Sequence, residues 1–165
     1  MYRLNCISSH VFARLMLALV LGWAVSANAQ TLRSEADNWL AECGASPDTD
    51  CSIIGVFKSS NPAGPTGSFS LLVDLRNRQV AVVGQPPPSR VTIRIDKNSG
   101  FECRGERYCI FVSDAEAIVR QLKSGSLVLV DVVAGKTVFR GSISTKGYRA
   151  ALDKIRAQGF QDLPD

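Results

Sequence analysis

Apolar and polar residues alternate along much of this chain, which is the pattern of β-strands. Between Arg90 and Asp96, the residues Val91, Ile93 and Ile95 alternate with charged or hydroxyl side chains. This two-residue period predicts a strand with one buried face and one wet face. Further apolar or β-branched runs, separated by turn residues, predict seven more strands at 39–43, 51–57, 69–75, 79–83, 110–112, 128–133 and 137–143.

Two later segments have a helical period instead. The first begins with a capping box, in which Ser113 is the predicted N-cap and Glu116 its partner, and it ends before Gly125. The second begins near Ser144 or Thr145 and ends at Gly159. The apolar faces predicted for the two helices are Ala115, Ile118, Val119 and Leu122, and then Tyr148, Ala151, Leu152 and Ile155. Eight short strands and two short helices predict a mainly β protein, a β-sandwich with helical additions.

The first 29 residues have the features of an export signal. Their only charges are Arg3 and Arg14, their apolar core spans residues 15–25, and Ala27-Asn28-Ala29 fits a signal-peptidase site. The apolar core is shorter than the ~20 residues of a membrane-spanning helix. A buried N-terminal helix is the alternative, but nothing would cap it. We expect cleavage after Ala29, with residues 30–165 forming one domain in the periplasm or at the cell surface, or secreted.

Removing the signal segment changes which chemistries are open to the chain. It contains the only histidine, His10, and its two arginines account for the fall in net charge from +4 to +2. A charge this close to neutral disfavours a nucleic-acid partner. Without histidine the mature chain lacks a Ser-His-Asp triad, a Cys-His pair and the usual zinc ligand sets. We therefore expect no enzyme activity, no cofactor, no metal site and no transmembrane span in the mature chain.

Carboxylates are the remaining candidates for catalysis, because a glycosidase needs only two of them, held ~5–10 Å apart. The candidates are Asp74, Asp96, Glu102, Glu106 and Asp131. Asp96 and Asp131 follow or end predicted strands, where solvated acids are common. We therefore favour a structural role for these acids.

Four cysteines remain in the mature chain: Cys43, Cys51, Cys103 and Cys109. An even number in an exported chain favours two disulfides, and three pairings exist. We favour the local pairs Cys43–Cys51 and Cys103–Cys109, as clamps at hairpin ends. Chain entropy alone does not exclude the crossed pairings. A zinc site is a further alternative, although neither spacing is that of a Cys-x-x-Cys knuckle.

Two further segments each have a structural and a functional interpretation. The prolines of residues 85–89 suit a rigid crossover between two sheets, or a polyproline ligand for an aromatic groove. Several arginines would form a basic rim for anionic lipid or glycan headgroups, or a solvated face whose field is cancelled by nearby acids. These arginines are Arg76, Arg78, Arg90, Arg94, Arg104 and Arg107.

The segment between Cys103 and Cys109 is the strongest candidate for recognition. Its five residues include Arg104, Arg107 and Tyr108, side chains that combine directional hydrogen bonds with rigid apolar area at interfaces. In the structural alternative, Tyr108 packs under the loop and the charges only solvate it.

The mature chain resembles the invasion-associated locus B family of exported alphaproteobacterial proteins. The residues that support the resemblance are Trp39 followed by Cys43 and Cys51, the strand 91–96 leading to the Cys103 and Cys109 loop, the helix end 122–125, and the closing segment 142–152. The similarity covers residues 39–155. The chain departs from the family pattern at Gln85-Pro86-Pro87-Pro88, which marks a distant member. The resemblance implies an immunoglobulin-like sandwich and, in some members, a role in host-cell entry; it implies no catalytic residues.

Two functional hypotheses follow from these observations. The first is a non-catalytic envelope or surface protein that acts in adhesion, host invasion or envelope upkeep. The second is a periplasmic inhibitor or binding module that presents a disulfide-closed loop. In either case the partner is a protein or an anionic component of a cell surface.

Overall fold

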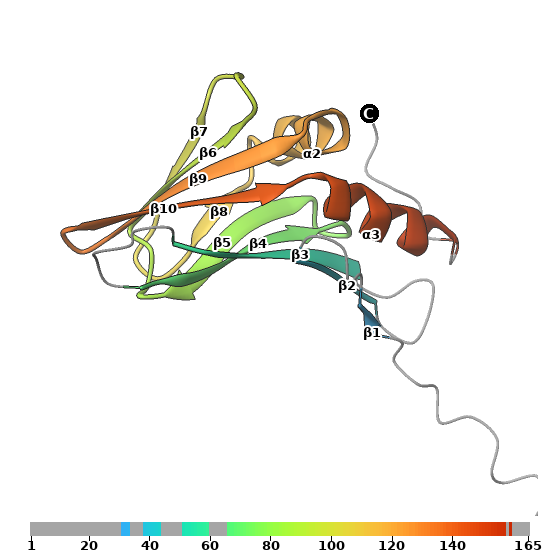
Figure 1. Cartoon of the computed structure of the whole chain (residues 1–165), viewed down its shortest axis with the longest axis horizontal. Helices are drawn as coiled ribbons and strands as arrows, with labels where there is room; N and C mark the ends of the chain where they lie inside the picture. The colour runs from blue at the N-terminus through green and yellow to red at the C-terminus, as the bar shows by residue number, and fades with distance from the viewer. Residues whose placement is uncertain (1–30, 34–37, 44–50, 60–65, 158, 160–165) are drawn as a thin grey trace, which may run out of the picture.

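Two antiparallel β-sheets face each other, and two helices pack at one end of the space between them (Figure 1). The computed structural model describes residues 31–33, 38–43, 51–59, 66–157 and 159. The predicted signal segment and its cleavage site lie outside the described residues. The two-sheet, two-helix architecture confirms the prediction of a mainly β sandwich.

The first sheet has six strands in the order β1-β2-β3-β4-β5-β8. Their bounds are β1 Thr31–Arg33, β2 Trp39–Cys43, β3 Cys51–Lys58, β4 Ser68–Asp74, β5 Gln79–Gln85 and β8 Cys109–Phe111. The first five strands follow one another as a meander, in which each strand pairs with its neighbour in the sequence. Strand β8 then joins the free edge of β5.

The second sheet has four strands in the order β10-β9-β6-β7. Their bounds are β6 Arg90–Ile95, β7 Phe101–Arg104, β9 Leu127–Ala134 and β10 Thr137–Ser144. Immunoglobulin constant domains divide seven strands into sheets of four and three, whereas this chain divides ten described strands into six and four. The sandwich is therefore confirmed, while its immunoglobulin-like detail is not.

The proline segment crosses from one sheet to the other. It joins Gln85 at the end of β5 in the first sheet to Arg90 at the start of β6 in the second sheet. Proline cannot donate a hydrogen bond to a sheet, so it separates the two strands. The prediction of a crossover is confirmed. Strand β6 also has the predicted alternation, since Val91, Ile93 and Ile95 are buried.

Helix α2, Ala115–Ser124, begins one residue later than the capping box predicted. Its N-cap is Asp114, which makes no side-chain capping bond, so the predicted role of Ser113 is wrong. Residues 112–114 form a turn after β8, and this turn shifts the helix start. The predicted buried face is correct. The helix ends at Gly125, where an added Cβ would lie 2.5 Å from Ile95 Cγ2.

Helix α3, Lys146–Ala157, closes the end of the core next to β2. Its predicted buried face is confirmed, and Tyr148 on that face meets Trp39 of β2 edge-on with ring centroids 5.4 Å apart. The Trp39 indole N–H donates to the Ser144 carbonyl at 2.7 Å. This bond connects β2 of the six-stranded sheet to β10 of the four-stranded sheet. No helix in the described part of the chain is long and apolar enough to cross a membrane.

Candidate functional site

Of the two predicted disulfides, the structure contains the one between Cys43 and Cys51. These residues lie directly opposite each other at the ends of β2 and β3, with their Cα atoms 4.2 Å apart. The direct cross-strand position explains why the bond forms. It closes the hairpin end next to residues 44–50, as predicted.

The predicted disulfide between Cys103 and Cys109 is absent, and both residues are free thiols. The prediction assumed a hairpin, but β7 and β8 do not pair with each other. Strand β7 pairs with β6 in one sheet, and β8 pairs with β5 in the other. Cys103 therefore has no cross-strand position opposite Cys109, and its thiol donates to the Ile110 carbonyl at 3.7 Å.

The two thiols are nevertheless close enough to affect each other. Burial raises the pKa of the Cys109 thiol to about 12, and a hydrogen bond with the Cys103 side chain adds to this rise. Because only a thiolate attacks an alkylating agent at a useful rate, we expect Cys109 to resist alkylation at neutral pH in the folded protein.

We therefore expect the folded domain to contain one disulfide and two free thiols. Denaturation without reductant, followed by alkylation and peptide mass spectrometry, should modify Cys103 and Cys109 but leave Cys43 and Cys51 linked. In the native protein, Cys109 should stay unmodified even above the ordinary thiol pKa of 9.0. A peptide that links Cys103 to Cys109 would contradict the structure at this point.

Residues 104–108 connect the two sheets at one end of the sandwich and line an open pocket. The pocket has a volume of about 330 Å³ and is lined by Arg104, Gly105, Glu106, Arg107, Tyr108 and Ile110. All three predicted recognition residues are thus brought together. Tyr108 is 54% exposed, so the alternative in which its ring packs under the loop is wrong.

Backbone hydrogen bonds fix the base of this loop. The Gly105 N–H donates to the Ser89 carbonyl at 3.1 Å, and the Ser89 N–H donates to the Val133 carbonyl at 2.8 Å. The loop also turns tightly, because a Cβ on Gly105 would lie 2.0 Å from the Tyr108 carbonyl oxygen. The pocket therefore has a defined shape before any partner arrives, which lowers the ordering cost of binding.

The charges around the pocket are mixed and mostly exposed. The Arg104 Nε lies 3.2 Å from a Glu102 carboxylate oxygen, and both side chains are largely in solvent. A pair of this kind contributes little to stability. Arg107 is exposed as well. The lining combines two guanidinium groups with the Glu106 carboxylate, the Tyr108 ring and the Ile110 side chain, and its excess of one positive charge suits an anionic group that is attached to an apolar one.

The six arginines of the predicted basic rim do not gather in one place. Arg76 and Arg78 lie in the turn before β5, whereas the pocket lies beyond the other end of that strand. Arg90 and Arg94 lie on the outer face of the second sheet, where Arg90 is opposite Arg104. The rim is therefore divided, and only Arg104 and Arg107 line the pocket.

Besides Glu102, which pairs with Arg104, three of the candidate carboxylates have structural partners. Asp74 accepts from the Asn77 amide N–H at 3.0 Å, and Asp96 accepts from the Ser126 and Leu127 amides at 3.0 Å each. Asp131 lies 3.6 Å from Arg140. Each carboxylate holds a turn, a strand start or a cross-strand pair.

One lining residue, Ile110, was assigned only to an apolar strand by the sequence. Its position follows from the alternation within β8, where Cys109 and Phe111 point into the core and Ile110 points outward. Gly105 was also missed, because the close approach to Tyr108 appears only in three dimensions.

Comparison of the chain with protein-family models, curated proteins and solved structures found no match to any of them.

Proposed function

We propose that this chain is an exported, non-catalytic binding protein of the cell envelope or cell surface, which holds an acidic protein partner in the pocket formed by residues 104–108. The observation that supports this most directly is the pocket itself, with two guanidinium groups and an exposed tyrosine around a fixed backbone. Export is supported by the features of residues 1–29.

The chemistry of the lining residues favours a carboxylate next to an apolar side chain. Arginine binds carboxylates through two parallel N–H donors, and tyrosine adds rigid contact area. The shape favours a receiving role over the inhibitor hypothesis, because residues 104–108 line an open hollow. A partner side chain can enter this hollow, whereas an inhibitory loop would need to project into a cleft of its target.

Within this proposal, adhesion or host invasion is the role that the family resemblance favours. The acidic partner would then be a surface protein of the host or of the bacterium itself. An envelope role requires the same pocket and differs only in where the partner is found.

The test is a crosslinked pull-down from envelope and host-surface fractions, comparing the wild type with an Arg104→Ala/Arg107→Ala/Tyr108→Ala variant. We expect the triple variant to lose the partner, because both charges and the ring are gone, and to keep its thermal midpoint, because all three side chains are exposed. Cell fractionation should find the bound form outside the cytoplasm, starting at Gln30.

The matched control is Arg78→Ala/Arg94→Ala/Val138→Ala, which removes two arginines and one exposed apolar residue elsewhere. It should retain the partner. Equal capture of the partner by the wild type and the triple variant would show that the pocket is not the binding site. An equal loss of the partner in the control variant would show that only the net charge of the protein matters. If the wild type bound vesicles of anionic lipid in the absence of a protein partner, the proposal that the ligand is an acidic protein would be wrong.

A further inference from the structure

The outer faces of the two sheets differ sharply in composition. On the four-stranded sheet, charged side chains occur on every strand: Arg90, Arg94, Glu102, Arg104, Asp131 and Arg140. On the six-stranded sheet, the two central rows of outward side chains contain no charge from β2 to β8, and Arg33 of β1 lies opposite Leu40 at the end of one row. A face of an antiparallel sheet that remains in water normally has polar residues.

Strand register places these uncharged residues side by side. Leu40 lies opposite Ile54, Ile54 opposite Leu72, Leu72 opposite Ala81, and Ala81 opposite Ile110. In the next row, Val56 lies opposite Ser70, and Ser70 opposite Val83. We call these two rows the apolar stripe: Leu40, Ile54, Leu72, Ala81, Ile110, Val56, Ser70 and Val83.

The stripe is partly exposed in the isolated chain: Ala81 is buried, and Leu40, Ile54, Ser70 and Leu72 are half-buried. Val56, Val83 and Ile110 have exposed fractions of 40%, 39% and 39%. With strands ~4.8 Å apart and successive outward residues ~7 Å apart, the eight positions of the stripe cover roughly 270 Å². The polar rows on both sides bring the face to roughly 600–700 Å², close to the ~800 Å² that each partner buries in a standard interface.

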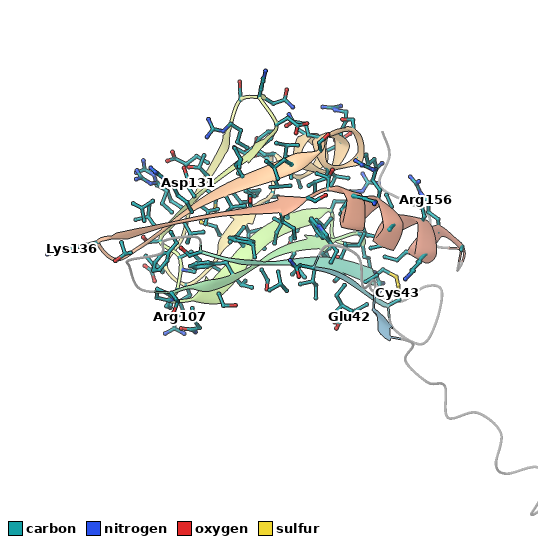
Figure 2. All side chains as sticks on the ribbon, viewed as in Figure 1. Glu42, Cys43, Arg107, Asp131, Lys136 and Arg156 are labelled. Carbon is teal, nitrogen blue, oxygen red and sulfur yellow. A yellow bond between two sulfur atoms is a disulfide. The ribbon has the colours of Figure 1, made fainter. Side chains whose placement is uncertain are left out.

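Charged residues of both signs border the stripe, and among them Glu42 and Arg107 lie at opposite ends. Figure 2 shows Glu42 and Arg107 on the same side of the six-stranded sheet, at its two ends. Glu42 extends from β2 in the row next to Leu40, and Arg107 lies in the loop before β8. A two-fold axis in the plane of this face that exchanges the two ends would place each Glu42 near the Arg107 of the other copy. The face is therefore complementary to itself in both its apolar centre and its charged ends.

We propose that the apolar stripe is the interface of a homodimer, in which two copies pack through the outer faces of their six-stranded sheets. This inference goes beyond the proposed function and is tested separately from it, although Arg107 belongs both to the pocket and to the charged border of the stripe. Two stacked sheets ~10 Å apart would bury both stripes and form a second apolar layer outside the sandwich core. Ile110 contributes to the stripe and to the pocket, whereas Val56 and Val83 contribute to the stripe alone.

The test is sedimentation velocity and light scattering of the purified protein, from micromolar to submillimolar concentration. The wild type should have the mass of a dimer. Val83→Lys should raise the dissociation constant at least tenfold, because a lysine would be buried opposite apolar side chains. Val56→Lys tests the same face from β3, and circular dichroism checks that both variants are folded.

The matched control is Val138→Lys on β10, where the valine is 46% exposed on the outer face of the other sheet. This variant should stay dimeric. Glu42→Lys should weaken the dimer several-fold, and the double variant Glu42→Lys/Arg107→Glu should restore it. A monomeric wild type at every concentration, equal dissociation by Val138→Lys, or no recovery in the double variant would each overturn the proposal. Since the stripe valines do not line the pocket, partner capture by Val83→Lys shows separately whether the proposed function holds.

Discussion

Replacing Trp39 by alanine should lower the free energy of unfolding by about 3–5 kcal/mol, the typical cost of deleting a large buried aromatic side chain. Trp39 is 1% exposed and packs edge-on against Tyr148 of α3. Its removal would also leave the Ser144 carbonyl without the indole donor. Small domains have a free energy of unfolding of about 5–15 kcal/mol, so this single change would remove a large part of the total stability.

Urea denaturation followed by far-ultraviolet circular dichroism measures this effect. Tryptophan fluorescence is unsuitable, because Trp39 is the only tryptophan after the predicted signal segment. Trp39→Phe keeps a ring against Tyr148 and loses the hydrogen bond, so its smaller loss separates packing from bonding. A loss below about 1 kcal/mol for the alanine variant would contradict the burial of this side chain.

The contacts of Trp39 also show what the sequence could predict about the fold. Local periods identified most strands and both buried helix faces, because alternation and helical spacing are properties of neighbouring residues. The bond from Trp39 to Ser144 joins residues 105 positions apart, and no local pattern encodes it.

Strand pairing was predicted less well than strand position, for the same physical reason. Strand β7 was not among the predicted strands, although Phe101 and Cys103 alternate with Glu102 and Arg104. The expected hairpin around Cys103 and Cys109 then failed, because the chain between them passes from one sheet to the other. Which sheet a short strand joins depends on tertiary packing, and the spacing of two cysteines does not reveal it.

The candidate site was predicted in its side chains but not in its shape. Arg104, Arg107 and Tyr108 were identified from residue type alone, since arginine and tyrosine suit recognition. The sequence could not show that Tyr108 is exposed, or that Ile110 shares the pocket with it. Both facts depend on the direction in which β8 leaves the loop.

Replacing Gly105 by alanine should distort the pocket more than any other single methyl group added to this loop. The new Cβ would start 2.0 Å from the Tyr108 carbonyl oxygen, and that atom belongs to the backbone, so no side-chain rotation relieves the clash. The loop must therefore open, which breaks the bond from the Gly105 N–H to Ser89. We expect a loss of about 1–3 kcal/mol, the usual cost of overpacking.

Limited trypsin digestion reports on this opening without any knowledge of the partner. Cleavage after Arg104 and Arg107 should become about tenfold faster in the Gly105→Ala variant, because local opening exposes the backbone to the protease. Gly135→Ala is the control: its φ of +60° strains the added side chain in an exposed turn, with no atom within 4 Å of the added Cβ. That variant should lose some stability and leave cleavage in the pocket loop unchanged. If Gly105→Ala also left cleavage unchanged, the loop would not be the tight, fixed structure on which partner binding is proposed to depend.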